Sequence, residues 1–87
     1  METIKVVRLK SGEDIVGYVT ETEDTINIGY PMVIRLITQQ GIQSFTIQSW
    51  LPHQIFKHNE ADIWINDVLF VNDVADEFVV YYRSEEH

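Results

Sequence analysis

Short β-branched stretches separated by turn residues run through most of this sequence and restrict its fold more than any other feature. Residues 4–10 alternate apolar and polar side chains, and a turn-forming run at residues 11–14 with Gly12 follows. A second such stretch spans residues 15–22. Alternation with a period of two, bounded by glycine and short polar side chains, is typical of half-buried strands joined as hairpins. The sequence therefore predicts a mainly β fold.

More strands follow along the chain. They are predicted at residues 25–29, 32–38, 42–50 and 63–71, the last as two short strands or as one bent strand kinked near Asn66 and Asp67. Pro31 is expected to end or interrupt pairing because it has no N–H to donate. Gly17, inside a strand, indicates a sharp bend or a close backbone approach. A tight turn is predicted at residues 39–41 and a long polar loop at residues 52–62.

The C-terminal part changes its period. Apolar side chains recur at helical spacing at Val74, Phe78, Tyr81 and Tyr82, which predicts a helix over about residues 73–84. Asn72 or Asp73 can cap its first turn. A last strand over residues 78–82 is the alternative, since these side chains also have high β-propensity.

Length and charge narrow the class of protein. The chain has 87 residues, which predicts a single domain over residues 1–87 with a small core that self-association would supplement. Cysteine is absent, and no apolar stretch is long enough for a membrane span, so we expect a cytoplasmic protein with no membrane partner. A net charge of −8 repels phosphate over most of the surface. A local basic patch at Lys5, Arg8 and Lys10 is the exception, with ordinary solvated strand positions as the alternative.

The sequence carries no catalytic signature such as a phosphate loop or a nucleophile elbow, which predicts a protein that is not an enzyme and has no cofactor. His53, His58 and Glu60 share one loop, but their irregular spacing favours a solvated loop over a metal site. Trp50 and Trp64 have apolar neighbours, so we expect them in the core or at a subunit interface rather than stacked on bases.

One run of residues points to a known family. It reads Leu9-Lys10-x-Gly12-x-x-Ile15-x-Gly17-x-Val19, followed by Ile26-Asn27. This run resembles the first motif of Sm and LSm proteins. The later residues, with Tyr30-Pro31-Met32, Trp50-Leu51-Pro52 and the segment 67–71 before a tyrosine-containing helix, look like small Sm-like proteins of marine tailed phages. That resemblance covers nearly the whole chain, and it implies a strongly bent five-stranded open barrel whose edge strands pair between subunits in a homo-oligomeric ring.

The same resemblance implies single-stranded RNA or DNA as a ligand. Asn27 matches the asparagine that holds a base in Sm rings, whereas Thr25 takes the place of the stacking aromatic, and Asn66-Asp67 that of Arg-Gly. Tyr30 is then the candidate stacking platform, with a buried tyrosine at a strand end as the alternative. The candidate phosphate contacts are Lys5, Arg8, Lys10 and Arg35.

A second hypothesis assigns the chain to a different class, a non-enzymatic assembly module that docks another protein and has no nucleic-acid role. The acidic surface favours this hypothesis. It predicts that the helix face of Val74, Phe78 and Tyr82, unless covered within the chain, contacts a partner or a subunit.

Overall fold

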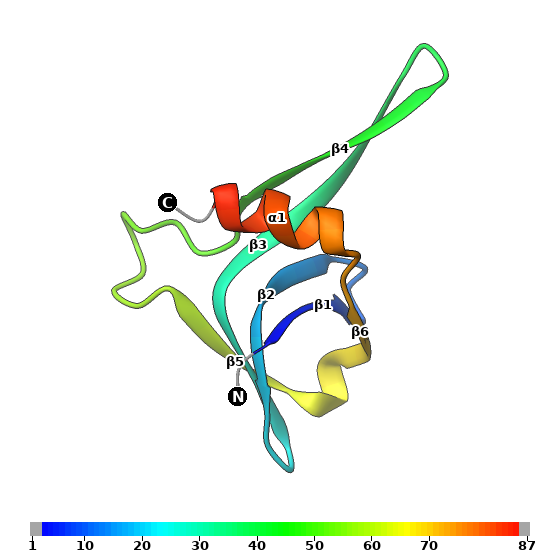
Figure 1. The fold of residues 1–87 in the computed structure, drawn as a ribbon. Helices are drawn as coiled ribbons and strands as arrows, with labels where there is room; N and C mark the ends of the chain where they lie inside the picture. The colour runs from blue at the N-terminus through cyan, green and yellow to red at the C-terminus, as the bar shows by residue number, and fades with distance from the viewer. Residues whose placement is uncertain (1–2, 86–87) are drawn as a thin grey trace.

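A computed structural model of the chain describes residues 3–85, and their fold is mainly β (Figure 1). The strands are β1 (Thr3–Leu9), β2 (Asp14–Glu21), β3 (Thr25–Gln39), β4 (Ile42–Ser49), β5 (Glu60–Trp64) and β6 (Val68–Asp73). A 3-10 turn, η1 (Ile65–Asp67), joins β5 to β6, and one helix, α1 (Asp76–Glu85), follows. The strands form one antiparallel sheet in the order β4-β3-β2-β1-β6, and β5 also pairs with β3. The predicted mainly β class with a C-terminal helix is confirmed, with six strands where five were expected.

Gly17 allows β2 and β3 to approach each other very closely. A Cβ atom at this position would lie 2.6 Å from the Ile28 Cγ2 atom and 2.7 Å from the Gly29 carbonyl oxygen. The pairing of β2 with β3 also shifts register between Val16 and Tyr18, and such bulges bend and twist a sheet. The close backbone approach that the sequence predicts at Gly17 is confirmed.

β3 runs through Pro31 as one strand where two separate strands were predicted, but its pairing is interrupted at this proline, as predicted. Val16 pairs with Met32 and Tyr18 with Gly29, which leaves Gly17 opposite the two residues Tyr30 and Pro31. In a bulge of this kind one residue is unpaired, and the missing N–H of a proline therefore costs no ladder hydrogen bond. β3 is then shared by two partners, since residues 25–29 pair with β5 and residues 32–39 with β4.

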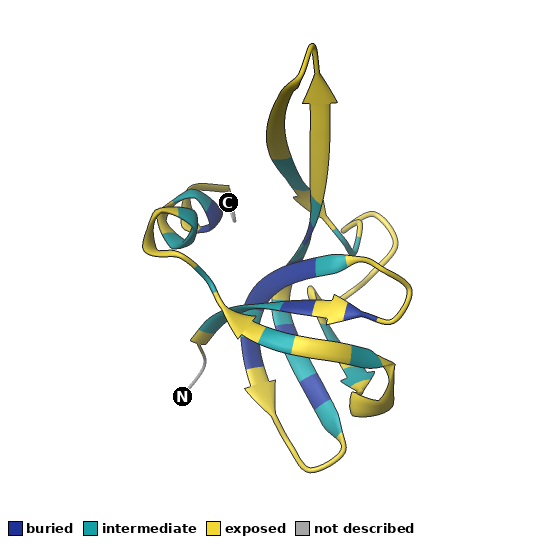
Figure 2. Cartoon of the chain, turned by 90° about the vertical axis from the view of Figure 1, so that its right-hand side faces the viewer, coloured by how far each residue is buried: buried dark blue, intermediate teal, exposed yellow. Residues whose placement is uncertain are grey.

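The outer half of β3 and all of β4 form a hairpin that projects from the rest of the molecule (Figure 1). Its turn residues Gln40 and Gly41 have φ values of 51° and 78°, as in a type I′ turn, which confirms the tight turn predicted there. The residues from Arg35 to Phe45 are exposed, as the yellow hairpin of Figure 2 shows. We call residues 35–46 the arm.

The three-residue turn η1 carries the chain from one edge of the sheet to the other. β5 ends at Trp64 on the side of β3, and β6 begins at Val68 beside β1. Four residues span at most about 15 Å, so the two edges of the sheet come close together here. The sheet is therefore strongly bent. Of the two predictions for residues 63–71, two short strands is the correct one, although β5 already begins at Glu60, inside the predicted loop.

The core lies on one face of β1, β2 and β3. It consists of Val7, Leu9, Ile15, Val19, Ile26, Ile28 and Val33, with Trp50, Ile63, Val68 and Val71 packed against it. Strand alternation places these side chains on one side of the bent sheet. The prediction that Trp50 belongs to the core is confirmed, whereas Trp64 is 62% exposed at the end of β5.

α1 covers the opposite face of the sheet. Tyr82 is completely buried beneath it, and its hydroxyl group donates a hydrogen bond of 2.7 Å to the Tyr30 carbonyl oxygen. The Tyr82 ring also packs edge-to-face on Tyr18, and Phe78 packs on Phe45 with 5.2 Å between ring centroids. The helical face that was expected to bind a partner if uncovered is thus covered by the chain itself.

The helix prediction is confirmed over the strand alternative, but the predicted start at residue 73 is wrong. Asn72 and Asp73 still belong to β6 and pair with Val6 and Lys5 of β1. Because the sheet holds these two residues, they cannot cap the helix. The first turn instead closes on the Ala75 carbonyl, which accepts hydrogen bonds from the N–H groups of residues 78 and 79.

Candidate functional site

Asn27, the candidate base-binding residue, lies on β3 beside a carboxylate. Its Nδ2 atom donates a hydrogen bond of 3.0 Å to Oδ1 of Asp62, which is its direct cross-strand partner on β5. The Ile65 N–H bonds to the Asp24 carbonyl oxygen at 3.0 Å, which brings the turn after β2 against η1. The side chains of Glu23, Asp24 and Asp67 therefore belong to the turns that flank Asn27. This end of the sheet is acidic and repels phosphate.

Most of the candidate phosphate-binding cations already interact with side chains of the same chain. The Arg8 guanidinium makes a bidentate pair with Asp14, at 2.7 and 2.8 Å, and lies 5.1 Å from the centroid of the Phe70 ring. This hydrogen bond with Asp14, together with the charge of the carboxylate, raises the pKa of Arg8. Lys5 Nζ lies 3.8 Å from Asp73 Oδ1, and Arg35 Nε donates to Gln48 Oε1 at 2.9 Å.

These cations also point in different directions. Lys5 and Arg8 are three residues apart on β1, and alternation places them on opposite faces of the sheet. Lys10 is exposed in the turn after β1. Arg35 lies at the base of the arm, on the face opposite to Arg8, because Asp14 pairs with Ile34. The structure does not gather these four side chains and Asn27 into one patch.

Tyr30 has an unusual backbone conformation next to a small cavity. Its φ is 50°, which is uncommon for a residue other than glycine, and its side chain is half-exposed rather than buried at a strand end. Its N–H donates to the Asn59 carbonyl oxygen at 2.8 Å, and its own carbonyl accepts the Tyr82 hydroxyl. These two bonds, one from each neighbouring segment, hold the strained residue in place.

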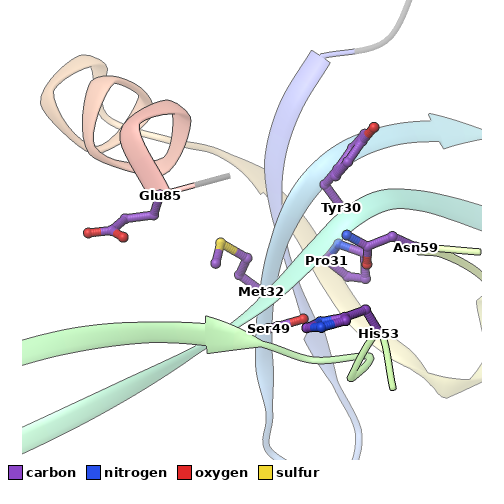
Figure 3. A pocket seen from close by; sticks show the side chains of 7 residues that line it. All are labelled: Tyr30, Pro31, Met32, Ser49, His53, Asn59 and Glu85. Carbon is purple, nitrogen blue, oxygen red and sulfur yellow. The ribbon is translucent and has the colours of Figure 1, made fainter. Parts of the chain in front are cut away.

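The cavity beside Tyr30 has a volume of about 190 Å³. It is lined by Tyr30, Pro31, Met32, Ser49, His53, Asn59 and Glu85. Figure 3 shows Ser49 and His53 side by side on one wall and Glu85 of α1 on the other side, while the Tyr30 ring points outward. The Ser49 hydroxyl donates to the Leu51 carbonyl oxygen, so it is held by its own loop rather than activated as a nucleophile.

The sequence favours a solvated loop over a metal site at His53, His58 and Glu60. Within residues 3–85, no three His, Cys, Asp or Glu side chains converge as ligands of a metal ion.

Of the helices in residues 3–85, none has both the length and the apolar character to cross a membrane.

Exposed apolar side chains gather at the edges of the sheet. On β6, Leu69 is 58% and Phe70 43% exposed, and at the end of β5 Trp64 and Ile65 are also exposed. The arm adds Leu36, Ile37, Ile42 and Phe45. The sequence predicts the hairpin of the arm and a strand at β6, but not that their apolar side chains are exposed. One signal bears on the arm: all fourteen acidic residues lie outside residues 25–59. Comparison of the sequence with protein-family models and with curated proteins finds no match to either.

Proposed function

We propose that this chain is a non-enzymatic, Sm-like assembly module that forms a homo-oligomeric ring by pairing β6 of one copy with β5 of the next. The observation that carries the proposal is the exposed apolar surface, which at the two edges consists of Trp64 and Ile65 at the end of β5 and of Leu69 and Phe70 on β6. Among residues 3–85, twelve large hydrophobic side chains are exposed, against nine hydrophobic side chains that are buried. Self-association would bury part of this surface and supplement the small core.

The two edges suit each other by their positions in the sheet. β5 and β6 lie at opposite ends of the bent sheet, so pairing one with the other is head-to-tail, a contact that gives a ring where the rotation between copies closes. Both edges also carry exposed apolar side chains, Leu69 and Phe70 on β6 and Trp64 at the end of β5. Pairing also protects edge strands that are otherwise an aggregation risk.

The Leu69→Asp variant tests this proposal. The new carboxylate places a charge at the exposed apolar centre of β6, and we expect the ring to dissociate while the fold persists, because Leu69 is already 58% exposed. Size-exclusion chromatography with light scattering measures the mass, and far-UV circular dichroism checks the fold. Val80→Asp is the matched control, since Val80 is 70% exposed on α1, away from both edges, and this variant should keep the wild-type mass. An unchanged mass in folded Leu69→Asp would contradict the proposal.

A second candidate function is binding of single-stranded RNA or DNA, and one observation favours it. Residues 25–59 lack acidic side chains and include the half-exposed Tyr30, the exposed Arg35 and Lys57. Phosphate would approach the part of this segment around Arg35 with less repulsion than the part around Asn27, which lies beside Asp62.

The Arg35→Gln variant tests the second candidate. If Arg35 contacts a phosphate, fluorescence anisotropy with U-rich and A-rich oligonucleotides at low salt should show weaker binding, and the salt dependence of log K should fall by about one in slope. Arg83→Gln, at the exposed end of α1, is the control with the same loss of charge and should bind like the wild type. Absence of binding by the wild-type chain at low salt would exclude this function.

A further inference from the structure

β4 is an edge strand without the usual protection. Its residues, Ile42–Ser49, include no charged residue, no proline and no glycine. By contrast, β5 carries Glu60 and Asp62, and β6 ends at Asp73. Proteins commonly block exposed edges with charges, prolines or bulges, because the free N–H and C=O groups can pair with another chain. A long, uncharged edge such as β4 is therefore a template for strand addition.

The geometry of the hairpin identifies which backbone groups are available. Gln39 pairs with Ile42 across a two-residue turn, so these two residues form the closing hydrogen-bonded pair. Antiparallel pairs alternate along the ladder, so Ile42, Ser44, Thr46 and Gln48 bond to β3. The N–H and C=O groups of Gln43, Phe45, Ile47 and Ser49 then point away from β3, toward the open side of the sheet.

The distribution of charge favours a second copy of the chain as the partner of the β4 edge. Residues 25–59 carry Arg35 and Lys57 and no acidic residue, within a chain whose net charge is −8. Two copies of an acidic protein repel each other over most of their surfaces, whereas two β4 strands, which carry no charged residue, meet without direct repulsion between carboxylates. The arm also projects beyond the body of its own chain, which contacts it at its base, where Phe45 packs on Phe78 of α1 (Figure 1).

The exposed side chains of the arm are also apolar, as expected of a surface that binds a second copy. Leu36 and Phe45 are direct cross-strand partners on one face, and Ile37 and Ile42 lie on the other face. We propose that β4 of one copy pairs antiparallel with β4 of a second copy about a two-fold axis, which continues both apolar faces into the partner arm. This contact uses neither β5 nor β6, so it joins two rings where rings form and makes a dimer where they do not.

The Gln43→Pro variant tests the arm contact. Proline removes an N–H that points away from β3, so the hairpin of each copy tolerates it, whereas the symmetric dimer loses two hydrogen bonds and gains a steric block. We expect the dissociation constant of the arm contact to rise at least about tenfold. Gln43→Thr keeps the N–H group and should behave like the wild type.

Masses from light scattering separate the arm contact from the ring. If both contacts form, Gln43→Pro halves the wild-type mass, Leu69→Asp gives a dimer of twice the 10.2 kDa chain, and the double variant gives the monomer. If the ring proposal fails, the wild type is already that dimer and Gln43→Pro alone gives the monomer. If Leu69→Asp gives a monomer, or if Gln43→Pro leaves the wild-type mass unchanged, the arm contact is overturned.

Distances between spin labels test the antiparallel arrangement itself. The chain has no cysteine, so a single cysteine can be placed at Gln40 or at Gln43 in the Leu69→Asp background. Gln43 lies level with Thr38, so the turn at Gln40 is about two residue steps farther from the two-fold axis, and moving the label there lengthens the distance between copies by about 13 Å. Equal distances at the two positions, or no dipolar signal, would overturn the proposal.

Discussion

Replacing Gly17 by alanine is expected to lower the free energy of unfolding by about 3 kcal/mol. The added Cβ would lie 2.6 Å from Ile28 Cγ2 and 2.7 Å from the Gly29 carbonyl oxygen. Ile28 is fully buried and the carbonyl belongs to the backbone, so neither neighbour can yield without moving β3. For a domain of this size, whose whole stability is on the order of 10 kcal/mol, such a loss is large. Urea denaturation followed by tryptophan fluorescence measures it.

Gly29→Ala is the matched control for Gly17→Ala. A Cβ at Gly29 would meet its nearest neighbours, two atoms of Tyr18, at 3.7 and 3.8 Å, which are ordinary van der Waals distances. Both substitutions add one methyl group to a strand, so they differ mainly in the space available. Equal stability of the two variants would mean that close approach at Gly17 does not hold the bend of the sheet.

Replacing Tyr82 by alanine is expected to cost about 4 kcal/mol of unfolding free energy. Tyr82 is the fully buried side chain that fixes α1 to the sheet, through its ring contact with Tyr18 and its hydrogen bond to the Tyr30 carbonyl. Its removal leaves a large cavity and takes away the donor to a carbonyl of a strained residue. We expect α1 to detach before the sheet unfolds, which hydrogen exchange of residues 76–85 would detect.

Tyr82→Phe separates the hydroxyl group from the ring. It keeps the packing and loses the hydrogen bond, so about 1 to 2 kcal/mol is expected. Val80→Ala, at a position that is 70% exposed on the same helix, should change stability by less than about 0.5 kcal/mol. If Tyr82→Ala were as mild as Val80→Ala, the helix would not depend on this anchor.

Local signals in the sequence predicted much of the fold, and contacts between distant residues explain where they failed. The positive φ of Gln40 and Gly41 follows from turn chemistry, and the period of residues 74–82 indicated the helix. The continuation of β3 through Pro31 depends on a bulge opposite Gly17, thirteen or more residues earlier, which the proline itself does not indicate. The late start of α1 likewise depends on the pairing of residues 72–73 with β1.

The candidate site was less predictable than the fold. Asn27 and Asp62 are 35 residues apart, so only the pairing of β3 with β5 shows that the amide already has a carboxylate partner. The Arg8–Asp14 pair was accessible from the sequence, because a hairpin around residues 11–14 places these two opposite each other. The absence of acidic residues from 25–59 was also readable, but its meaning depends on the projecting arm, which no local pattern predicts.

The mass of the wild-type chain in solution, measured by analytical ultracentrifugation over a hundredfold dilution, tests the proposed assembly most directly. An assembly module must associate, because its edges expose Leu69, Trp64 and Ile42 to water as a monomer. The predicted result is a discrete species at a fixed multiple of 10.2 kDa that persists on dilution into the low micromolar range. A folded monomer at every concentration would contradict both the ring and the arm contact.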